Sequence, residues 1–300
     1  MNAQVLLVHG GAGSDLRAKL DPALDAAHRA GVQAALAAGS ALLADGGSAL
    51  DAVTAAIRVL EDDPVFNAGI GAALTRAGHA ELDAAIHDGE TGRAGAVTGV
   101  RRLREPIAAA RLVMERSGHV LMAGAGAEAW CEEAGARMAE DGWAVTPHCR
   151  AHLQRWRETG IARSIGTVGA VALDRAGRLA AGTSTGGLTG KRPGRIGDSP
   201  LIGCGTWADG RVAVSCTGDG EAFIRACAAH TLAVTAQGAP VATAAEAALS
   251  AVRRQGGTGG LISVANDGTW AMRHTTSDLV RGVWSAAGMQ VALYGDEPLH

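Results

Sequence analysis

The stretch GTVGAVALDRAGRLAAGTSTGG, residues 166–187, holds the clearest strand pattern in the chain. Residues 168–173 and 178–183 are mostly small or apolar, and the turn DRAG at 174–177 separates them. A turn of this kind between two apolar runs is typical of a β-hairpin. Gly and Thr stand at the open ends of both runs, so the stretch predicts a sheet whose strand ends carry hydroxyl and amide groups.

The regions on either side of this hairpin divide into blocks of strands and blocks of helices. The apolar run 5–8 is expected to be a strand that enters a glycine turn, HGGAG at 9–13. Periodicity, proline positions and turn residues further predict helices over 22–44, from a capping box at 48–51 to about 60, after Pro106, near 220–237 and over 242–255, and strands over 81–87, 94–101, 212–217, 261–264 and 269–273. Such blocks favour an antiparallel sheet covered by helices.

Between residues 135 and 165 the apolar periodicity is lost, and we expect the later part of this segment to be a surface linker. The GAGAEA run at 124–129 follows only a short apolar run, and we expect no βαβ unit around it. It is interpreted as the start of a helix bounded by glycines rather than as a dinucleotide-binding fingerprint.

Composition excludes several classes of protein. The 300 residues are 47% hydrophobic and carry a net charge of −3, which is incompatible with disorder and gives no electrostatic case for DNA, RNA or an anionic membrane. No uncharged apolar stretch reaches ~18 residues, and the N-terminus lacks a signal-peptide pattern. The five cysteines are an odd number without a CxxC motif, so we expect reduced thiols in a cytoplasmic protein.

Four clusters of Gly, Thr and Ser concentrate polar groups in one region, at 166–169, 183–187, 194–200 and 217–221. Small hydroxyl and backbone amide groups on loops orient ligands and form oxyanion holes. Each cluster alone is an ordinary set of tight turns.

The combination resembles a known family. HGGAG at 9–13, FNAGIG at 66–71, ELDA at 81–84, the four clusters in order and GGLI at 259–262 are similar to the plant-type L-asparaginase/isoaspartyl aminopeptidase family of N-terminal-nucleophile hydrolases. The resemblance implies an α+β fold, a four-layer αββα sandwich with antiparallel sheets. It also implies hydrolysis of the side-chain amide of L-asparagine and of β-aspartyl (isoaspartyl) dipeptides, with release of L-aspartate.

The resemblance implies that the chain cuts itself between Gly166 and Thr167, into residues 1–166 and 167–300. Gly166 has no Cβ and can adopt a strained backbone that brings the Thr167 hydroxyl to the preceding carbonyl. Cleavage would free the Thr167 α-amino group, whose ordinary pKa of ~7.7–8.0 suits a general base at neutral pH. Thr167 would then supply both the nucleophile and the base.

The remaining site residues are carried over from the same family. Thr185 would lie beside the Thr167 hydroxyl, and Thr217 and Gly218 would form the oxyanion hole. The substrate-binding residues that the resemblance implies are Arg195 for the α-carboxylate, Asp198 for the α-amino group, Gly218, Gly220 and Asn67.

No cofactor is expected to be required. Structural sodium is implied in a loop whose backbone carbonyls come from Leu60, Glu61, Phe66, Ala68 and Ile70. The expected partner is a small-molecule substrate, with no nucleic acid and no membrane, and the resemblance implies a dimer of αβ units, that is, a heterotetramer.

Two departures from the family leave the preference between L-asparagine and isoaspartyl dipeptides open. Asp219 stands inside the TGDG run at 217–220, where its carboxylate could repel an acidic substrate or select an amine-bearing leaving group. RHTTSDLVRG at 273–282 matches the family's late motif only loosely.

Alternatives remain. GTSTG at 182–186 matches a nucleophile elbow, which would make Ser184 the nucleophile of an α/β-hydrolase with His274. HCRAH at 148–152 has a zinc-ligand spacing but lacks the general-base Glu, so solvated histidines are the simpler interpretation. A glycosylasparaginase-like amidase and a non-catalytic small-molecule-binding homologue are the other two readings.

Overall fold

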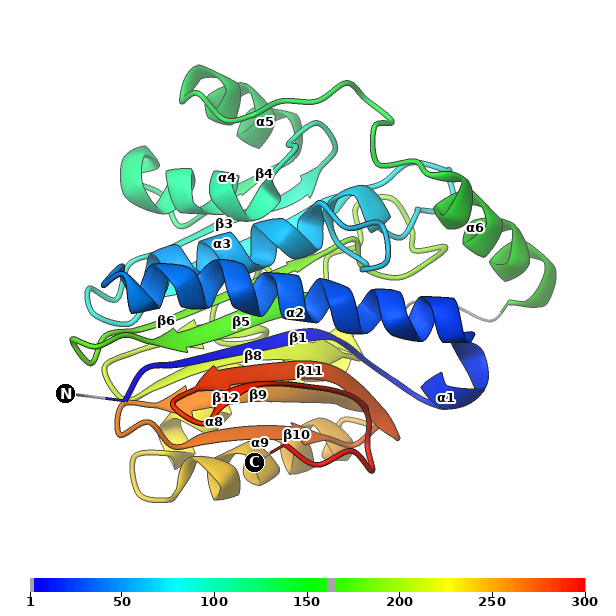
Figure 1. Cartoon of the computed structure of the whole chain (residues 1–300). Coiled ribbons are helices and arrows are strands. Elements are labelled where there is room, and N and C mark those ends of the chain that lie inside the picture. Colours follow the sequence, from blue (N-terminus) through cyan, green and yellow to red (C-terminus); the bar gives the residue numbers. More distant parts are fainter. Residues whose placement is uncertain (1–2, 161–165, 300) are drawn as a thin grey trace.

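The computed structural model describes residues 3–160 and 166–299 and arranges them in four layers (Figure 1). Helices cover the outer face of a large sheet, a smaller sheet packs against its inner face, and a second group of helices covers the smaller sheet. The expected four-layer αββα sandwich of the α+β class is confirmed.

The large sheet has eight strands in the order β12-β11-β1-β5-β6-β2-β3-β4. Its strands are β1 (Val5–Gly13), β2 (Leu82–Asp88), β3 (Ala94–Val100), β4 (Leu121–Ala123), β5 (Val168–Leu173), β6 (Leu179–Thr185), β11 (Asp278–Ser285) and β12 (Gly288–Tyr294). The pairing of β3 with β4 is parallel, whereas its other pairings are antiparallel. The expectation of purely antiparallel sheets is therefore wrong at this edge, where a crossover helix joins the two strands.

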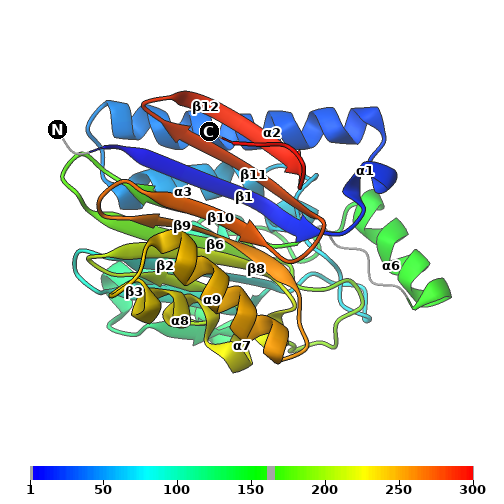
Figure 2. The same ribbon diagram turned by 90° about the horizontal axis from the view of Figure 1, so that it is seen from below.

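The small sheet has four strands in the order β10-β9-β8-β7 and is antiparallel throughout. Its strands are β7 (Thr206–Ala208), β8 (Val212–Gly218), β9 (Gly259–Ala265) and β10 (Trp270–His274). Seen from below in Figure 2, its covering helices α7 (Gly220–Ala226), α8 (Ala228–Thr235) and α9 (Val241–Arg254) lie on the face away from the large sheet.

The outer helices of the large sheet are α2 (Pro22–Ala44), α3 (Ala49–Glu61) and α4 (Pro106–Leu112). Shorter elements are α1 (Leu16–Lys19), the 3-10 turn η1 (Gly69–Gly71), the π-helical turn η2 (Val113–Ser117), α5 (Gly124–Glu133) and α6 (Pro147–Thr159). Ser48 and Asp51 form the predicted capping box of α3, and Pro106 is the first residue of α4.

Three apolar layers separate these four. Leu36, Ile57 and Phe66 belong to the layer between the outer helices and the large sheet. Leu7, Val171 and Ile262 belong to the layer between the two sheets. Phe223, Leu232 and Leu249 belong to the layer under the small sheet. Burial of this apolar surface supplies the main driving force for folding.

Three local predictions are wrong. HGGAG at 9–13 is part of strand β1, with a bulge between His9 and Gly11, because β11 pairs with it from the far end of the chain. The helix expected at 220–237 is broken at Cys227, which adopts a left-handed conformation. The expected linker contains α6, which the Thr146 side chain caps, and residues 161–165 lie outside the described residues.

The βαβ prediction is also wrong in part. The parallel strands β3 and β4 are joined through α4, so a short βαβ unit precedes the GAGAEA run. That run starts α5 at Gly124, as a glycine-bounded helix start predicts. Because β4 is the edge strand, no parallel strand follows α5 in the sheet to complete a nucleotide-binding crevice among the described residues.

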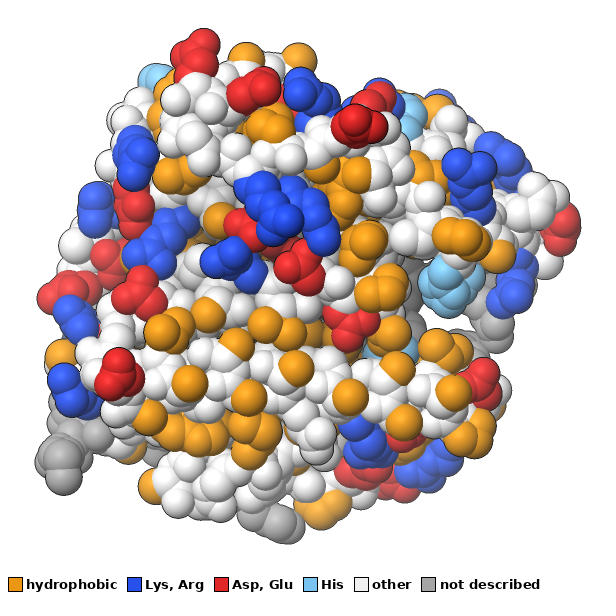
Figure 3. Space-filling model, turned by 45° about the horizontal axis from the view of Figure 1, so that its top comes forward, with side chains coloured by type: hydrophobic (Ala, Val, Ile, Leu, Met, Phe, Trp, Pro, Cys, Tyr) orange, Lys and Arg blue, Asp and Glu red, His pale blue; other side chains and the backbone are white. Residues whose placement is uncertain are grey.

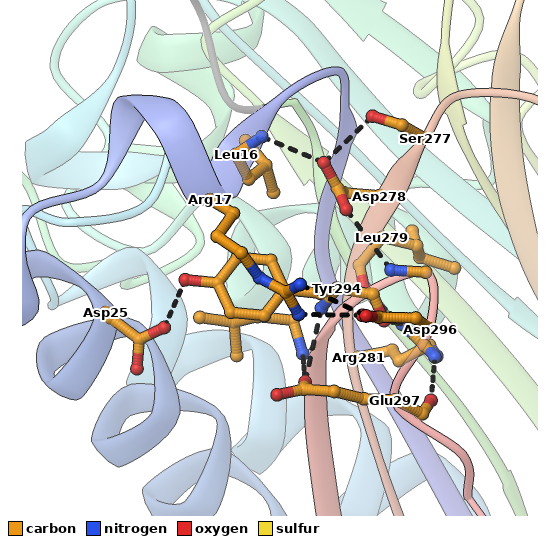
Figure 4. Close-up of polar contacts among 12 residues, drawn as sticks. Leu16, Arg17, Asp25, Ser277, Asp278, Leu279, Arg281, Tyr294, Asp296 and Glu297 are labelled. Carbon is orange, nitrogen blue, oxygen red and sulfur yellow. Dashed lines mark hydrogen bonds and ion pairs between the residues drawn. The ribbon is translucent and has the colours of Figure 1, made fainter.

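The end of the chain returns to α1 and α2 and forms a polar cluster, which we call the C-terminal clasp (Figure 4). The Arg17 guanidinium lies 4.4 Å from the centre of the Tyr294 ring and 2.8 Å from Asp296. Arg29 pairs with Glu297 at 2.6 Å, and the Tyr294 hydroxyl donates to Asp25. The clasp ties residues on the N-terminal side of the Gly166–Thr167 peptide to residues on its C-terminal side.

Side chains of both charge signs are interspersed on the face shown in Figure 3. On α3 and the segment that leads into α4, Arg58 pairs with Glu105 at 2.7 Å and Arg104 pairs with Asp62 at the same distance. Within the described ranges, no helix combines the length and apolar character needed to cross a membrane.

Candidate active site

Thr167 lies directly before β5, in the middle of the large sheet, and the residue is 8% exposed. Because β5 and β6 are antiparallel, the start of β5 lies beside the end of β6, where Thr185 stands. The Thr167 and Thr185 hydroxyl oxygens are 3.2 Å apart. Thr185 Oγ1 also accepts a hydrogen bond from Gly187 N at 3.0 Å, which fixes its orientation. The expected pair of threonine hydroxyls is therefore assembled.

Ser199 is a neighbour of Thr167 that the sequence did not single out. Its Oγ lies 3.4 Å from Thr167 Oγ1, and the residue is 1% exposed. Its position next to Asp198 in the GRIGDSP run was the only available signal. A second hydroxyl within reach of Thr167 can hold its Oγ1 in one orientation.

The peptide that precedes Thr167 is enclosed by backbone. A Cβ placed on Gly11 would lie 2.5 Å from Gly166 N and 2.8 Å from the Gly166 carbonyl carbon. Gly11 also has φ +116, which L side chains rarely adopt. A side chain at this position would push β1 away from the Gly166–Thr167 peptide, so glycine is required on two grounds.

Thr217 closes the same space from the small sheet. Its Oγ1 accepts a hydrogen bond from Ala12 N at 3.2 Å and would lie 2.5 Å from a Cβ on Gly166. Gly218 follows at the end of β8 with φ +144. A hydroxyl and a backbone N–H from these two residues are the groups that an oxyanion hole uses.

Arg195, Asp198 and Gly220 lie together beside this site. Arg195 donates from Nε and Nη2 to the two oxygens of Glu221 at 2.9 and 2.8 Å. A Cβ on Gly220 would lie 2.8 Å from Arg195 Nη2 and 3.0 Å from Asp198 Oδ1, so both charged side chains converge on this glycine. Glu221 was not predicted, although it follows Gly220 directly in the sequence.

Asp198 has a buried carboxyl group whose hydrogen bonding is incomplete among the described residues. Asp198 Oδ2 is buried and has no hydrogen-bond partner among the described residues. Loss of solvation raises the pKa of Asp198 from 3.8 to about 7, although Arg195 acts in the opposite direction. A cationic group that reached Oδ2 would satisfy the oxygen and favour the ionised form.

The hydrogen bonds of Asn67 are made to the loop after Thr185 and not to Thr167. Its Nδ2 donates to Gly187 O at 2.7 Å, and its Oδ1 accepts from Ala73 N at 2.7 Å. Its backbone carbonyl also accepts from Gly186 N at 3.0 Å. These bonds hold the loop after Thr185, so Asn67 is a positioning residue in this structure.

The loop expected to hold sodium is tightly wound. A Cβ on Gly69 would lie 2.1 Å from the Glu61 carbonyl oxygen, and one on Gly71 would lie 2.0 Å from the Phe66 carbonyl oxygen. Leu60 lies near the end of α3, and Ala68 and Ile70 lie at η1. Carbonyl oxygens of this loop therefore lie against its glycines, and oxygen ligands suit a hard cation.

The Glu61 side chain makes hydrogen bonds outside the loop in which its backbone carbonyl lies. Its Oε1 accepts from Ser184 Oγ at 2.6 Å and from Ile107 N at 2.9 Å, and its Oε2 has no partner among the described residues. Loss of solvation raises the pKa of Glu61 from 4.5 to about 8. The carboxyl group links the end of α3 to the strand residue that precedes Thr185.

Behind Thr167, polar side chains run between the two sheets, and we call them the hydroxyl column. His9 Nε2 lies 2.9 Å from Ser215 Oγ, and Ser215 Oγ lies 2.7 Å from Thr183 Oγ1. Thr206 Oγ1 lies 2.6 Å from Thr183 Oγ1 and donates to the Ser199 carbonyl at 3.0 Å. Burial lowers the pKa of His9 to about 3, so the imidazole is neutral at physiological pH.

The geometry also places three further residues that the sequence analysis discussed. Ser184 is a buried strand residue bonded to Glu61, and His274 lies on the small sheet with its Nδ1 against Thr276 O, so the nucleophile-elbow reading is wrong. Asp219 is exposed, and its carboxylate accepts from Thr258 N at 2.7 Å, which turns it toward Thr258.

The histidine pair lies on a helix rather than in a linker. The rings of His148 and His152 on α6 are 4.2 Å apart. Among the residues that the structure describes, no group of three His, Cys, Asp or Glu side chains is placed to hold a metal ion.

Comparisons with known proteins agree with this geometry. A family model described as asparaginase matches residues 2–293. The isoaspartyl peptidase of Salmonella typhimurium is 45% identical to this chain, over 96% of this chain and 97% of that protein. The isoaspartyl peptidase of Escherichia coli is 43% identical over 96% and 94%, and the isoaspartyl peptidase/L-asparaginase of Homo sapiens is 38% identical over 98% and 96%.

The Glu61 carboxyl group predicts a pH-dependent stability. Between pH 4.5 and about 8 the folded chain keeps a proton that the unfolded chain has lost, so this group makes folding less favourable as pH rises. Glu61→Gln cannot ionise, and its stability relative to the wild type should rise by about 2–3 kcal/mol between pH 6 and pH 8. Urea unfolding at both values measures the difference. The exposed Glu246→Gln should follow the wild type, and a constant difference for Glu61→Gln would contradict the assignment.

Proposed function

The chain belongs to the asparaginase family, and on this premise we propose that it hydrolyses the side-chain amide of L-asparagine and of β-aspartyl dipeptides, with release of L-aspartate. The observation that carries the proposal is the buried Thr167 hydroxyl, 3.2 Å from the Thr185 hydroxyl and preceded by a glycine peptide enclosed by β1 and Thr217. The reaction needs a hydroxyl nucleophile, a base and an oxyanion hole, and this end of the sandwich offers the groups for all three.

The proposed maturation step uses the enclosed peptide. Thr167 Oγ1 attacks the Gly166 carbonyl carbon, the C–N bond breaks, and the acyl group moves from nitrogen to oxygen. Water then hydrolyses the ester and leaves a Gly166 carboxylate and a free Thr167 α-amino group. The products are residues 1–166 and 167–300, and the C-terminal clasp is one set of contacts that holds them together.

In the mature site, the neutral α-amino group of Thr167 takes the proton from its own hydroxyl. Oγ1 attacks the side-chain carbonyl of the substrate, and the Thr217 hydroxyl and the Gly218 N–H stabilise the oxyanion. The protonated base returns its proton to the departing ammonia or amine. Water then cleaves the β-aspartyl ester on Thr167, and L-aspartate leaves.

Substrate recognition is assigned to the charged side chains next to Gly220. Arg195 takes the α-carboxylate, because a guanidinium offers several donors in one plane. Asp198 takes the α-ammonium group, which supplies the partner that its buried Oδ2 lacks among the described residues. Ser199 orients Thr167 Oγ1, and Asn67 orients the loop after Thr185.

The assembly and the compartment are also parts of the proposal. A dimer of αβ units follows from the resemblance, and a cytoplasmic location fits the five cysteines, which are all free. The proposed chemistry requires no cofactor beyond the structural cation discussed below.

Cleavage can be tested with Thr167→Ala. Removal of the hydroxyl should leave one chain of 30.2 kDa without hydrolase activity, whereas the wild type should yield two pieces that begin at residue 1 and at Thr167. Intact mass under denaturing conditions and N-terminal sequencing distinguish them. Ser199→Ala keeps the nucleophile and should still be cut. An active, uncut Thr167→Ala protein would exclude the mechanism.

The role of Asp198 predicts a pH effect on substrate binding. Below about pH 7 the buried carboxyl group is protonated and cannot balance an ammonium group, so KM for L-asparagine should rise as pH falls through 7. Bound substrate favours the ionised form of Asp198, so this carboxyl group should affect kcat less than KM, and a fall in kcat below about pH 8 would report protonation of the Thr167 α-amino group. Asp198→Asn should raise KM about 100-fold, as expected for the loss of a charged hydrogen bond of ~3 kcal/mol. The variant should also lose the rise of KM below pH 7.

Steady-state kinetics from about pH 5.5 to 9 measure both parameters. Asp219→Asn is the matched control, because that carboxylate faces Thr258, and it should keep the wild-type profile. A wild-type KM independent of pH would remove Asp198 from ammonium binding.

The sodium ligands remain a proposal, which the tight winding of the loop around Gly69 and Gly71 supports. Leu60, Glu61, Phe66, Ala68 and Ile70 would hold the ion through backbone oxygens, and the ion would stabilise the segment that carries Asn67. At 100 times its dissociation constant a bound ion adds about 2.7 kcal/mol. Replacing sodium by choline at equal ionic strength should therefore lower the thermal midpoint by several degrees. Glu61→Gln keeps the carbonyl and should keep the effect, whereas equal midpoints in both salts would contradict the site.

A further inference from the structure

Two of the free cysteines lie against one carbonyl group. Cys204 Sγ is 3.9 Å from Ile224 O, and Cys227 Sγ is 3.6 Å from the same oxygen. Two different segments of the chain therefore bring their sulfur atoms to the same carbonyl oxygen. We propose that Cys204 and Cys227 form a modification site, a dithiol that a hydroperoxide converts reversibly to a disulfide.

Backbone hydrogen bonds hold the two cysteines in place. The carbonyl groups of Gly203 and Cys204 accept from His230 N at 2.9 Å and from Ala229 N at 3.1 Å, in the first turn of α8. Cys227 is the residue directly before that helix. A disulfide usually has its Cα atoms about 4.4–6.8 Å apart, and these hydrogen bonds hold the segment of Cys204 against the start of the helix that Cys227 precedes.

The conformation of Cys227 makes its side chain unusual. It has φ 43 and ψ 52 and joins the end of α7 to the start of α8. Asp15 is the only other non-glycine residue with positive φ in the described ranges. Backbone preference alone favours glycine or asparagine at such a junction. A cysteine here is not explained by local conformation, and its placement next to Cys204 provides a reason for it.

The two thiols differ in a way that sets the order of reaction. Cys227 is exposed, whereas Cys204 is half-buried and loss of solvation raises its pKa to about 12. Cys227 is therefore the thiol that meets the peroxide. Its thiolate attacks one peroxide oxygen, which yields a sulfenic acid and releases an alcohol, or water from hydrogen peroxide. Cys204 Sγ then attacks Cys227 Sγ, the S–O bond breaks, and the thiol proton leaves with the hydroxyl group as water.

The other cysteines provide an internal comparison. Cys131, Cys149 and Cys216 are buried, and burial raises the pKa of Cys216 well above its ordinary value. Oxidation should therefore be confined to the pair, both members of which lie within residues 167–300.

The pair lies behind the proposed substrate site. Cys204 belongs to the segment that carries Asp198 and Ser199, and Cys227 ends the helix that carries Glu221, the partner of Arg195. A disulfide would join these two segments and limit their relative movement. This consequence for substrate binding rests on the proposed function, whereas the existence of the disulfide does not.

Mass spectrometry tests the site directly. Purified full-length protein is treated with stoichiometric hydrogen peroxide, free thiols are alkylated, and peptides are mapped without reductant. The wild type should lose about 2 Da through one crosslink between Cys204 and Cys227, and dithiothreitol should restore both thiols. Cys204→Ser should instead accumulate oxygen adducts of about 16 or 32 Da on Cys227. Cys227→Ser should remain unmodified, and Cys216→Ser should behave as the wild type.

Other products would overturn the proposal. Crosslinks between two chains, a disulfide that includes Cys216, or wild-type Cys227 that proceeds to sulfinic acid without a crosslink would each show that the two thiols do not react as a pair. Two unmodified thiols after treatment would do the same. The assay is repeated in Thr167→Ala, where no hydrolase activity is expected, so a failure of the disulfide and a failure of the proposed function are separate results.

Discussion

The contact between the backbones of Gly11 and Gly166 is the constraint on which the rest of the site depends. A Cβ on Gly11 would overlap the Gly166 peptide, so β1 can lie against the residue before Thr167 only because Gly11 carries no side chain, while a Cβ on Gly166 would overlap Thr217 Oγ1. The bulge in β1 between His9 and Gly11 turns this stretch toward the peptide while the strand keeps its pairing with β11. The central strands of the large sheet thus bring together a peptide near the middle of the chain and a strand from its start.

The interface between the two sheets changes character along the strands for the same reason. Away from the site this interface is an apolar layer that contains Leu7, Val171 and Ile262. Near Thr167 it becomes the hydroxyl column, whose members bond to one another from opposite sheets. Burial of an unpaired polar group costs about 1–3 kcal/mol, so the column is tolerated because its hydroxyl groups meet partners. A neutral His9 fits this environment, since a charged imidazole would have no carboxylate in the column to balance it.

Local patterns predicted much of this fold because capping boxes, proline positions and hairpin turns act over a few residues. The α3 capping box, the proline at the start of α4 and the β5–β6 hairpin are of this kind. The strand character of HGGAG was missed because it depends on pairing with β11. The paired residues of β1 and β11 are more than 260 positions apart in the sequence. In the site, the threonine pair followed from the family motifs, whereas Ser199, Glu221 and the Glu61 carboxyl group act through contacts between distant segments.

The charges of Arg195, Asp198 and Glu221 determine which kind of ligand this part of the site can bind. Glu221 occupies Nε and Nη2 of Arg195, which fixes the guanidinium plane and leaves Nη1 beside Gly187 and Gly197, where side chains would crowd it. Asp198 stays buried close by with one oxygen unpaired among the described residues. With Glu221 bound, the arrangement holds one cation between two acids, so an incoming anion alone would be poorly compensated. A zwitterion supplies an ammonium group for Asp198 together with a carboxylate for the free edge of Arg195, and this pairing favours α-amino acids over simple acids or simple amines.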